Sequence, residues 1–381
     1  MESDSNNFLE EVIPDDQQED EGDLVGGIEF RNSVVLNTDW TVGTLYDQIK
    51  RENIDLDPTF QRRAAWDPVR QSRLVESIIV GMPIPNIVLA EKKDNRGQFM
   101  VIDGKQRLIA LKSFIEGDLV LKGLDIRTDL NGAEFNKLES SDRNYFENST
   151  IRTTLIRNWG DEKFLYAMFY RLNSGSLQLS PQELRRALVG GMLMDAIDAY
   201  IERSEAFVSI FGSGFDRRMR DSELVLRFIA FNDSLPSYSG DLKLFLDSAV
   251  RHYEENWSGV QDILEKNFNS LDLALKTARA IFGRDAFKKH NSTGYERRIN
   301  RAVFDCLART FSDPNVASWC VEHAGEVRNA FNEVCQISEF KDAIEKTTKS
   351  LTATKSRIRI WSERIAGLMG KVFDPASQRI Q

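Results

Sequence analysis

Residues 101–111 read VIDGKQRLIAL and determine how the first half of the chain is expected to fold. The run VI continues a short apolar segment that predicts a strand, and RLIAL has helical spacing. An acid, a glycine and three polar residues therefore stand at a strand-to-helix corner. The corner consists of Asp103, Gly104, Lys105, Gln106 and Arg107.

This corner has the chemistry of an anion site. A helix N-terminus exposes unpaired N–H groups and carries about half a positive charge. Gly104 would let an anion approach the backbone closely, which favours phosphate. Arg107 can fold back over the helix end and grip phosphate oxygens with two bonds. Lys105 adds a point charge, and Gln106 can orient a water or a base edge.

The carboxylate of Asp103 would repel a phosphate and needs another role. It can hold Mg²⁺, orient the arginine, or take a proton from an attacking water. An ordinary helix cap with solvated Lys105 and Arg107 explains the same stretch without a ligand. The chain contains no GxxxxGK[ST] sequence, so the corner is not a Walker A loop.

Periodicity on either side of the corner predicts an α+β protein. We expect helices at 41–53, 67–81, 105–115, 161–175 and 180–188, and strands at 86–92, 98–102 and 149–157. Beyond residue 190 nearly all of the chain has helical spacing. The predicted organisation is an acidic disordered tail (1–27), a mixed α/β domain (28–190) and an all-helical domain (191–375).

The 381 residues carry a formal net charge of −9, and the charge is concentrated at one end. Residues 1–24 hold ten acids and no Lys or Arg, which leaves the rest at +1. Such a segment is typical of a solvated tail. The alternative is a DNA mimic that covers a basic groove in the body.

Composition also bears on the compartment. The chain has no apolar run long enough for a membrane helix and no secretory leader pattern. Three cysteines without CxxC spacing predict core residues of a cytoplasmic protein; they are Cys306, Cys320 and Cys335.

Two more polar clusters end predicted elements. FQRRAAW (60–66) contains Gln61 and Arg62, and FYRLNSG (169–175) contains Arg171 and Asn173. Each cluster is embedded in apolar sequence, and each could converge with the corner.

Taken in order, four stretches resemble the DUF262 family over about 40–190: FQRRAAWDPVRQSRLVESIIVGMPIP, NIVLAEK, VIDGKQRLIAL and FYRLNSGSLQLSPQELRRAL. This family belongs to the ParB/sulfiredoxin-like superfamily, and its relatives include the N-terminal domains of GmrSD and SspE. The resemblance implies a ParB/sulfiredoxin-like fold that binds, and hydrolyses, a nucleoside triphosphate with Mg²⁺. It also implies a cytoplasmic, restriction-type anti-phage system in which the domain senses or regulates DNA targeting with a partner effector protein.

The family signatures carry over residue by residue. The signature D-G-Q-Q-R corresponds to Asp103, Gly104, Gln106 and Arg107, with Lys105 in place of a glutamine; F-Q-R corresponds to Gln61 and Arg62, and R-L-N to Arg171 and Asn173. By this resemblance Asp103 and Gln106 would be catalytic, and Asp103 would hold Mg²⁺. The residues expected to bind the nucleotide are Gln61, Arg62, Gly104, Lys105, Arg107, Arg171 and Asn173.

Nuclease members of the family usually carry an HNH domain, DUF1524. None of His252, His290 and His323 has an HNH-like setting, and residues 288–301 read as a basic surface loop. We therefore expect cleavage to depend on a partner. Alternatives are a non-catalytic DNA-binding adaptor that uses the same corner, or a ParB-like nuclease. Lys355, Arg357 and Arg359 lie in a locally basic segment that predicts either DNA backbone contact or a core helix with a solvated face.

Overall fold

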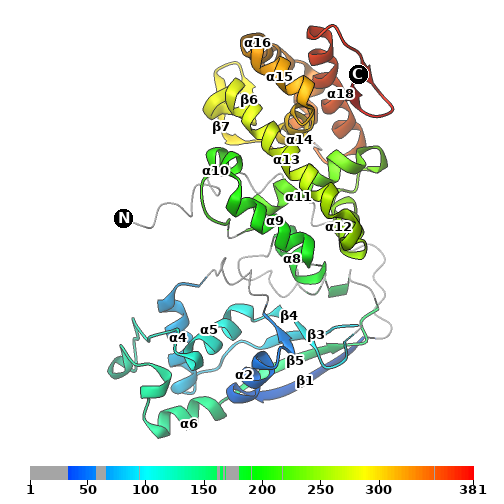
Figure 1. Ribbon diagram of the computed structural model, residues 1–381. Helices are drawn as coiled ribbons and strands as arrows, with labels where there is room; N and C mark the ends of the chain where they lie inside the picture. Colours follow the sequence, from blue (N-terminus) through cyan, green and yellow to red (C-terminus); the bar gives the residue numbers. More distant parts are fainter. Residues whose placement is uncertain are drawn as a thin grey trace. The chain divides into compact units, whose positions relative to one another are not determined.

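The computed structural model describes residues 33–56, 66–93, 95–160, 164–165, 168, 180–189, 191–216, 218–346 and 348–381. The chain divides between residues 179 and 180 into two compact units, which are described separately (Figure 1). We call the described part of the first (33–168) the sheet unit and that of the second (180–381) the helical unit. The predicted acidic tail, 1–27, lies outside the described residues.

The sheet unit alternates strands and helices. Its elements are β1 Val34–Thr41, α2 Val42–Lys50, β2 Ile54–Asp55, α4 Pro68–Ile79, β3 Ile87–Glu91, β4 Phe99–Asp103, α5 Lys105–Glu116, η3 Thr128–Leu130, η4 Phe135–Lys137, α6 Ser140–Asn148 and β5 Thr150–Arg157. Most follow the predicted bounds closely. The sequence-based reading did not predict β1, and most of the predicted helix 161–175 lies outside the described residues.

The sheet is mixed, with strand order β1-β5-β3-β4-β2. The pairs β1–β5 and β3–β4 are antiparallel, and β5–β3 and β2–β4 are parallel. Apolar residues of α2, α4, α5 and α6 pack with one face of the sheet as a single core, in which Phe114, Phe135 and Phe146 contact one another edge-on or tilted. Strand β4 pairs with β3 on one side and β2 on the other, which holds the corner that follows β4 in place.

Helix α4 shows why these elements form where they do. Asp67 accepts the N–H groups of Val69 and Arg70 at 2.8 and 2.9 Å, and Pro68 occupies the first turn. The helix also carries Glu76, a buried carboxylate that accepts the backbone N–H groups of residues 125–127. Burial alone would raise the pKa of Glu76, but these three donors bring it below its ordinary value. Glu76 therefore anchors the loop that follows α5.

The helical unit is built almost wholly from helices. Its elements are α8 Pro181–Val189, α9 Met192–Arg203, α10 Glu205–Phe211, α11 Arg220–Ser234, η5 Leu235–Ser237, α12 Leu242–Glu255, α13 Trp257–Phe282, η6 Gly283–Asp285, β6 Lys288–Asn291, β7 Gly294–Ile299, α14 Arg301–Phe311, α15 Pro314–Glu322, α16 Ala324–Val334, α17 Ser338–Glu345, α18 Leu351–Leu368, β8 Phe373–Asp374 and β9 Arg379–Ile380. The chain is therefore α+β, as predicted.

Two hairpins interrupt the helices. The segment predicted as a basic surface loop is the antiparallel hairpin β6–β7, so that prediction was wrong. Lys289 in β6 is nearly buried and pairs with Glu296 and Glu345, which neutralises part of the local charge. A short β8–β9 hairpin follows α18.

Helices α13 and α14 run through the core of the helical unit. Eleven residues of α14 are buried along its whole length, and α13 presents an apolar stripe over 26 residues. The three cysteines are free and buried in this unit, which confirms their prediction as core residues. Burial raises the pKa of Cys306, that of Cys320 to about 12 and that of Cys335 to about 11.

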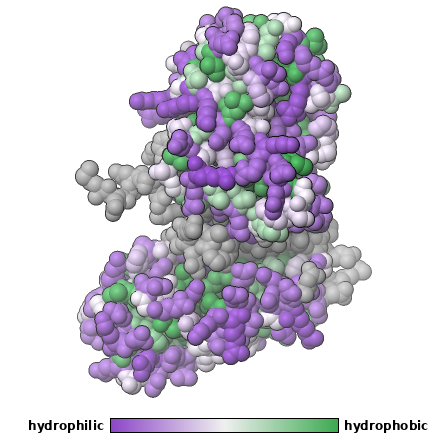
Figure 2. Space-filling model, viewed as in Figure 1, coloured by the Kyte–Doolittle hydropathy of each residue, from purple (hydrophilic) through white to green (hydrophobic). Residues whose placement is uncertain are grey.

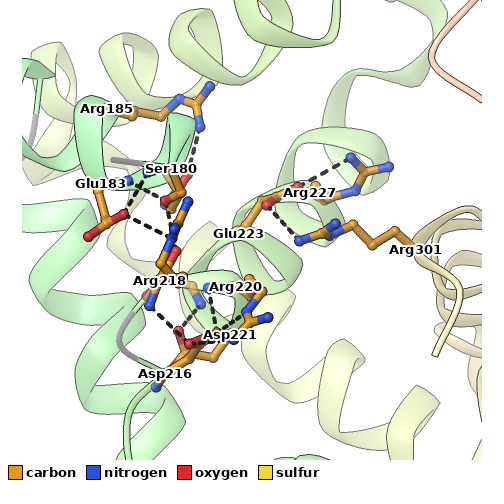
Figure 3. A network of polar contacts seen from close by, with 12 residues as sticks. Ser180, Glu183, Arg185, Asp216, Arg218, Arg220, Asp221, Glu223, Arg227 and Arg301 are labelled. Atoms are coloured by element: carbon orange, nitrogen blue, oxygen red, sulfur yellow. Dashed lines mark hydrogen bonds and ion pairs between the residues drawn. The ribbon is translucent and has the colours of Figure 1, made fainter. Parts of the chain in front are cut away.

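Buried ion pairs cross-link the helices of this unit. Figure 3 shows Glu223 of α11 between Arg227 and Arg301, with N···O distances of 3.6 and 3.4 Å. Arg227 also reaches Asp305 at 2.5 Å, so α11 and α14 are joined by charge as well as by apolar packing. A buried charge is tolerated only when it is paired in this way.

The start of α8 carries the predicted capping box. The Ser180 hydroxyl accepts the N–H of Glu183 at 3.1 Å, and the Glu183 carboxylate accepts the N–H of Ser180 at 2.6 Å (Figure 3). Burial raises the pKa of Glu183 to about 7, even though Arg218 lies 3.5 Å from its carboxylate. This glutamate therefore titrates near neutral pH.

The visible surface of both units is largely hydrophilic, with apolar residues in scattered patches (Figure 2). Within the described residues, every helix is too short or too polar to cross a lipid bilayer.

Candidate functional site

The predicted corner forms at the end of β4, an inner strand that lies between β3 and β2. Asp103 is the last residue of β4, Gly104 follows with φ +96° and ψ +10°, and Lys105 begins α5. This left-handed conformation is one that glycine adopts at little cost. The N-cap residue Gly104 has no side chain with which to cap the first turn of α5. The amides of that turn therefore keep the capacity to bind an anion.

Arg107 folds back over Gly104, as its spacing from the helix start predicts. A Cβ atom added at Gly104 would lie 3.2 and 3.3 Å from Nη2 and Nε of Arg107. It would also lie 3.0 Å from Cγ1 of Ile87, on the neighbouring strand β3. The absent side chain at position 104 thus makes room for the guanidinium directly above the helix end.

Asp103 holds this guanidinium in place. Nη2 of Arg107 donates to Oδ2 of Asp103 at 2.7 Å and to the carbonyl oxygen of Asn86 at 3.0 Å. Oδ1 of Asp103 accepts the N–H of Gly104 at 2.7 Å. The side chains of Arg107 and Asp103 are 13% and 27% exposed, so the pair is shielded but reachable. Of the roles open to Asp103, these contacts favour orienting the arginine.

Two polar atoms at the corner are buried without a hydrogen-bond partner among the described residues. They are Oε1 of Gln106 and Nε of Arg107. Buried polar atoms are nearly always paired, and an exception calls for a bound molecule, a water or a functional role. One acceptor and one donor are therefore available to a ligand at the first turn of α5.

The backbone carbonyl of Asn86 is a site group that sequence reasoning missed. Nδ2 of Asn86 lies 3.4 Å from Oγ1 of Thr154, which donates to Oδ1 of Asn37 at 2.8 Å. These contacts extend a polar row from the corner across β5 to β1. The one sequence signal was an asparagine after Pro85, directly before a buried strand beside the corner.

Of the other residues predicted to bind the nucleotide, only one lies in the described part of the chain. Lys105 is half-buried at the first position of α5. Gln61, Arg62, Arg171 and Asn173 lie outside the described residues.

The predicted DNA-contacting residues do not form a free basic surface. Arg357 is 1% exposed and pairs with Asp305 at 2.9 Å in the core of the helical unit, so its prediction as a DNA contact was wrong. Arg359 is paired with Glu339 at 2.9 Å and Glu363 at 3.0 Å. Lys355 is exposed.

Cysteine, histidine and carboxylate side chains of the described residues do not gather in any group of three with metal-binding geometry. His323 stacks on Trp319 and contacts its carbonyl oxygen at 2.9 Å, and His290 lies in β6 against Tyr295. Asp103 is the carboxylate that the corner itself offers to a cation.

The segment that contains this corner matches a known protein family. Residues 42–190 match the family model described as the N-terminal domain of the GmrSD restriction endonuclease. Residues 42–190 are similar to this domain, and we call them the GmrSD-type segment. The match confirms the predicted family and makes this segment a restriction-related domain. No curated protein matches the chain.

The GmrSD-type segment contains the whole corner and ends just after α8. It begins at the first residue of α2, so β1 precedes it. Helix α8 and its capping box fall inside the match but belong to the helical unit.

Proposed function

We propose that the corner of the GmrSD-type domain binds the terminal phosphates of a nucleoside triphosphate. The observation that carries this proposal is the pairing of an uncapped helix start with a guanidinium seated over Gly104, whose Nε has no partner among the described residues. Helix amides and an arginine together supply the donors that phosphate oxygens accept. The domain would then act as a nucleotide-dependent sensor or regulator in restriction-type defence.

The roles at the corner follow from the contacts. Arg107 would bind phosphate oxygens through Nε and the helix amides would bind the adjacent ones. Asp103 would act as a positioning residue, since both of its oxygens already hold groups that face the ligand. Gln106 would offer its unpaired oxygen to a water, a base or a sugar hydroxyl. Mg²⁺ bound to the triphosphate would neutralise its charge, and Asp103 is the nearby carboxylate that fits such an ion.

Hydrolysis is the further expectation for this site. Among the described residues of the corner, the carboxylate of Asp103 can take the proton of an attacking water, and the amide oxygen of Gln106 can orient that water. A shielded corner suits a terminal phosphate better than a continuous DNA backbone, which favours nucleotide over the adaptor and nuclease alternatives.

The test is a thermal-shift and calorimetry panel of ATP, GTP, CTP and UTP, each with Mg²⁺, followed by a phosphate-release assay. We expect one nucleotide to stabilise the protein, and Arg107→Ala to abolish that shift. Arg107→Lys should also lose most of it, because a lysine lacks the planar donor pair. Lys50→Gln, an exposed charge change at the end of α2, is the matched control and should bind normally.

Asp103→Asn separates binding from turnover. It should weaken nucleotide binding less than Arg107→Ala does and lower phosphate release further. Full binding by Arg107→Ala, or the absence of any nucleotide-dependent shift, would remove the proposed site. Metal-dependent nicking of DNA that Asp103→Asn abolishes would instead favour the nuclease alternative.

A further inference from the structure

A second site lies at the end of the sheet opposite the corner. It is a pocket of about 550 Å³ formed by the turn between β3 and β4, the end of β5 and the start of β1. We call it the turn pocket. Strands β3 and β4 separate it from the corner by five residues each, which is about 16 Å at 3.3 Å per residue. The two sites therefore do not share lining residues.

Among the described residues, cations outnumber carboxylates in the lining of the turn pocket. Four basic residues and one carboxylate, Glu91, line it within that part of the chain; the basic residues are Lys92, Lys93, Arg96 and Arg157. Lys92 pairs with Asp55 at 2.9 Å and Arg157 with Glu91 at 3.5 Å. Within the described residues, neither Lys93 nor Arg96 forms an ion pair with a carboxylate. Among those residues, two positive charges at the pocket are therefore not offset by a paired acid; Asp94, Asp161 and Glu162 lie outside the described residues.

Lys93 is held in position by two described groups that carry no formal charge. Its ammonium group lies 4.5 Å above the ring of Trp159 and donates to the carbonyl oxygen of Gly160 at 2.8 Å. The indole N–H of Trp159 donates to the carbonyl oxygen of Glu91 at 2.7 Å, which fixes the ring beneath the turn. Such preorganisation lowers the entropy cost of gripping an anion.

An apolar wall stands beside the charges. Val34 and Leu36 of β1 line the pocket and are 40% and 42% exposed. Cations next to exposed apolar side chains match a ligand that alternates phosphate with less polar sugar and base surface.

We infer that the turn pocket binds the phosphodiester backbone of DNA. Its cations come from separate segments and each can meet a different phosphate, whereas a single terminal phosphate calls for converging donors like those at the corner. This assignment does not depend on nucleotide binding at the corner. It places DNA contact in the sheet unit rather than on α18, where Arg357 and Arg359 are committed to acidic partners.

The test is fluorescence anisotropy of a labelled 20-base-pair duplex, titrated from 50 to 200 mM salt. We compare the full chain with Lys93→Gln/Arg96→Gln and with two controls. Lys50→Gln changes an exposed charge elsewhere in the sheet unit, and Lys93→Arg/Arg96→Lys keeps the pocket charge. The slope of log affinity against log salt concentration is negative, and each lost phosphate contact reduces its magnitude by about 0.9. The glutamine pair should therefore reduce the magnitude by about 1.8. Both controls should keep the wild-type slope.

Several results would overturn the assignment. They are an unchanged slope in the glutamine pair, an equal loss in Lys50→Gln, or displacement of the duplex by millimolar inorganic phosphate. Thermal unfolding checks that each variant folds. Should the glutamine pair fail to fold, the single change Arg96→Gln takes its place and should reduce the magnitude of the slope by about 0.9. Nucleotide binding should be unchanged in the glutamine pair, which separates this site from the corner. Loss of nucleotide binding alone would assign the pocket to the nucleotide and refute DNA contact.

Discussion

Replacing Gly104 by alanine tests the geometry of the corner most directly. The change adds one Cβ atom at φ +96°, where a side chain costs about 1–2 kcal/mol. The atom would also meet Cγ1 of Ile87 at 3.0 Å and Nη2 of Arg107 at 3.2 Å, so one of them must move. Overpacking of this kind adds about 1 kcal/mol or more. We expect Gly104→Ala to lower the free energy of unfolding by about 2–4 kcal/mol.

The other end of the same helix provides a matched control. Gly117 ends α5 with φ +86°, and a Cβ atom there would meet nothing within 4 Å. Gly117→Ala should therefore cost only the backbone strain, about 1–2 kcal/mol. Urea denaturation of both variants measures the difference, because a shifted midpoint at constant slope reports stability.

Nucleotide binding should also differ between the Gly104→Ala and Gly117→Ala variants. If phosphate binds beneath Arg107, Gly104→Ala should lose nucleotide-dependent stabilisation, and Gly117→Ala should keep it. Equal losses of stability in the two variants would refute the close approach at residue 104. Normal nucleotide binding by a folded Gly104→Ala protein would show that the position of the Arg107 guanidinium over residue 104 is not required for binding.

Three further predictions concern buried charges. The pKa of Glu76 is lowered, so its contribution is present above about pH 4.3 and is lost as pH falls; Glu76→Gln should cost about 1–3 kcal/mol at pH 7 by urea denaturation, with a smaller difference at pH 3.5. A penalty that persists unchanged at pH 3.5 would contradict this. The pKa of Glu183 is raised to about 7, so the wild-type protein loses stability as pH rises through 7. Glu183→Gln keeps the capping contacts and does not ionise. Its free energy of unfolding relative to wild type should therefore increase by up to about 3 kcal/mol between pH 5 and pH 8. A flat difference across that range would argue against the shift. Arg357→Ala should cost about 3–5 kcal/mol in thermal or urea unfolding and leave DNA affinity of the folded protein unchanged. A selective loss of DNA binding would reverse that assignment.

Much of the sheet unit could be predicted because its signals are local. Asp67-Pro68 starts α4, the Ser180 and Glu183 pair starts α8, and the Asp103-Gly104 corner joins a strand to a helix where predicted. In each case the residues that define the element contact one another within a few positions of the chain. The roles of the corner residues stay predictions.

The features that the sequence did not predict depend on contacts between distant parts of the chain. Strand β1 exposes three apolar residues in a row, so it has no alternating pattern, and only its partner β5 defines it. Arg357 looks solvated from the sequence because its partner Asp305 lies 52 residues earlier. The carbonyl oxygen of Asn86 carries no side-chain signature at all. Contacts made across the fold decide these features, and periodicity does not report them.

The three buried thiols offer a reporter of motion. Since all of them lie in the helical unit and burial disfavours their reactive thiolate form, alkylating reagents should modify them only when that unit opens. The rate of labelling would then measure the opening of the helices alone. Nucleotide or duplex added to the reaction would slow or speed the labelling only if occupancy of the sheet unit changes how often its neighbour opens.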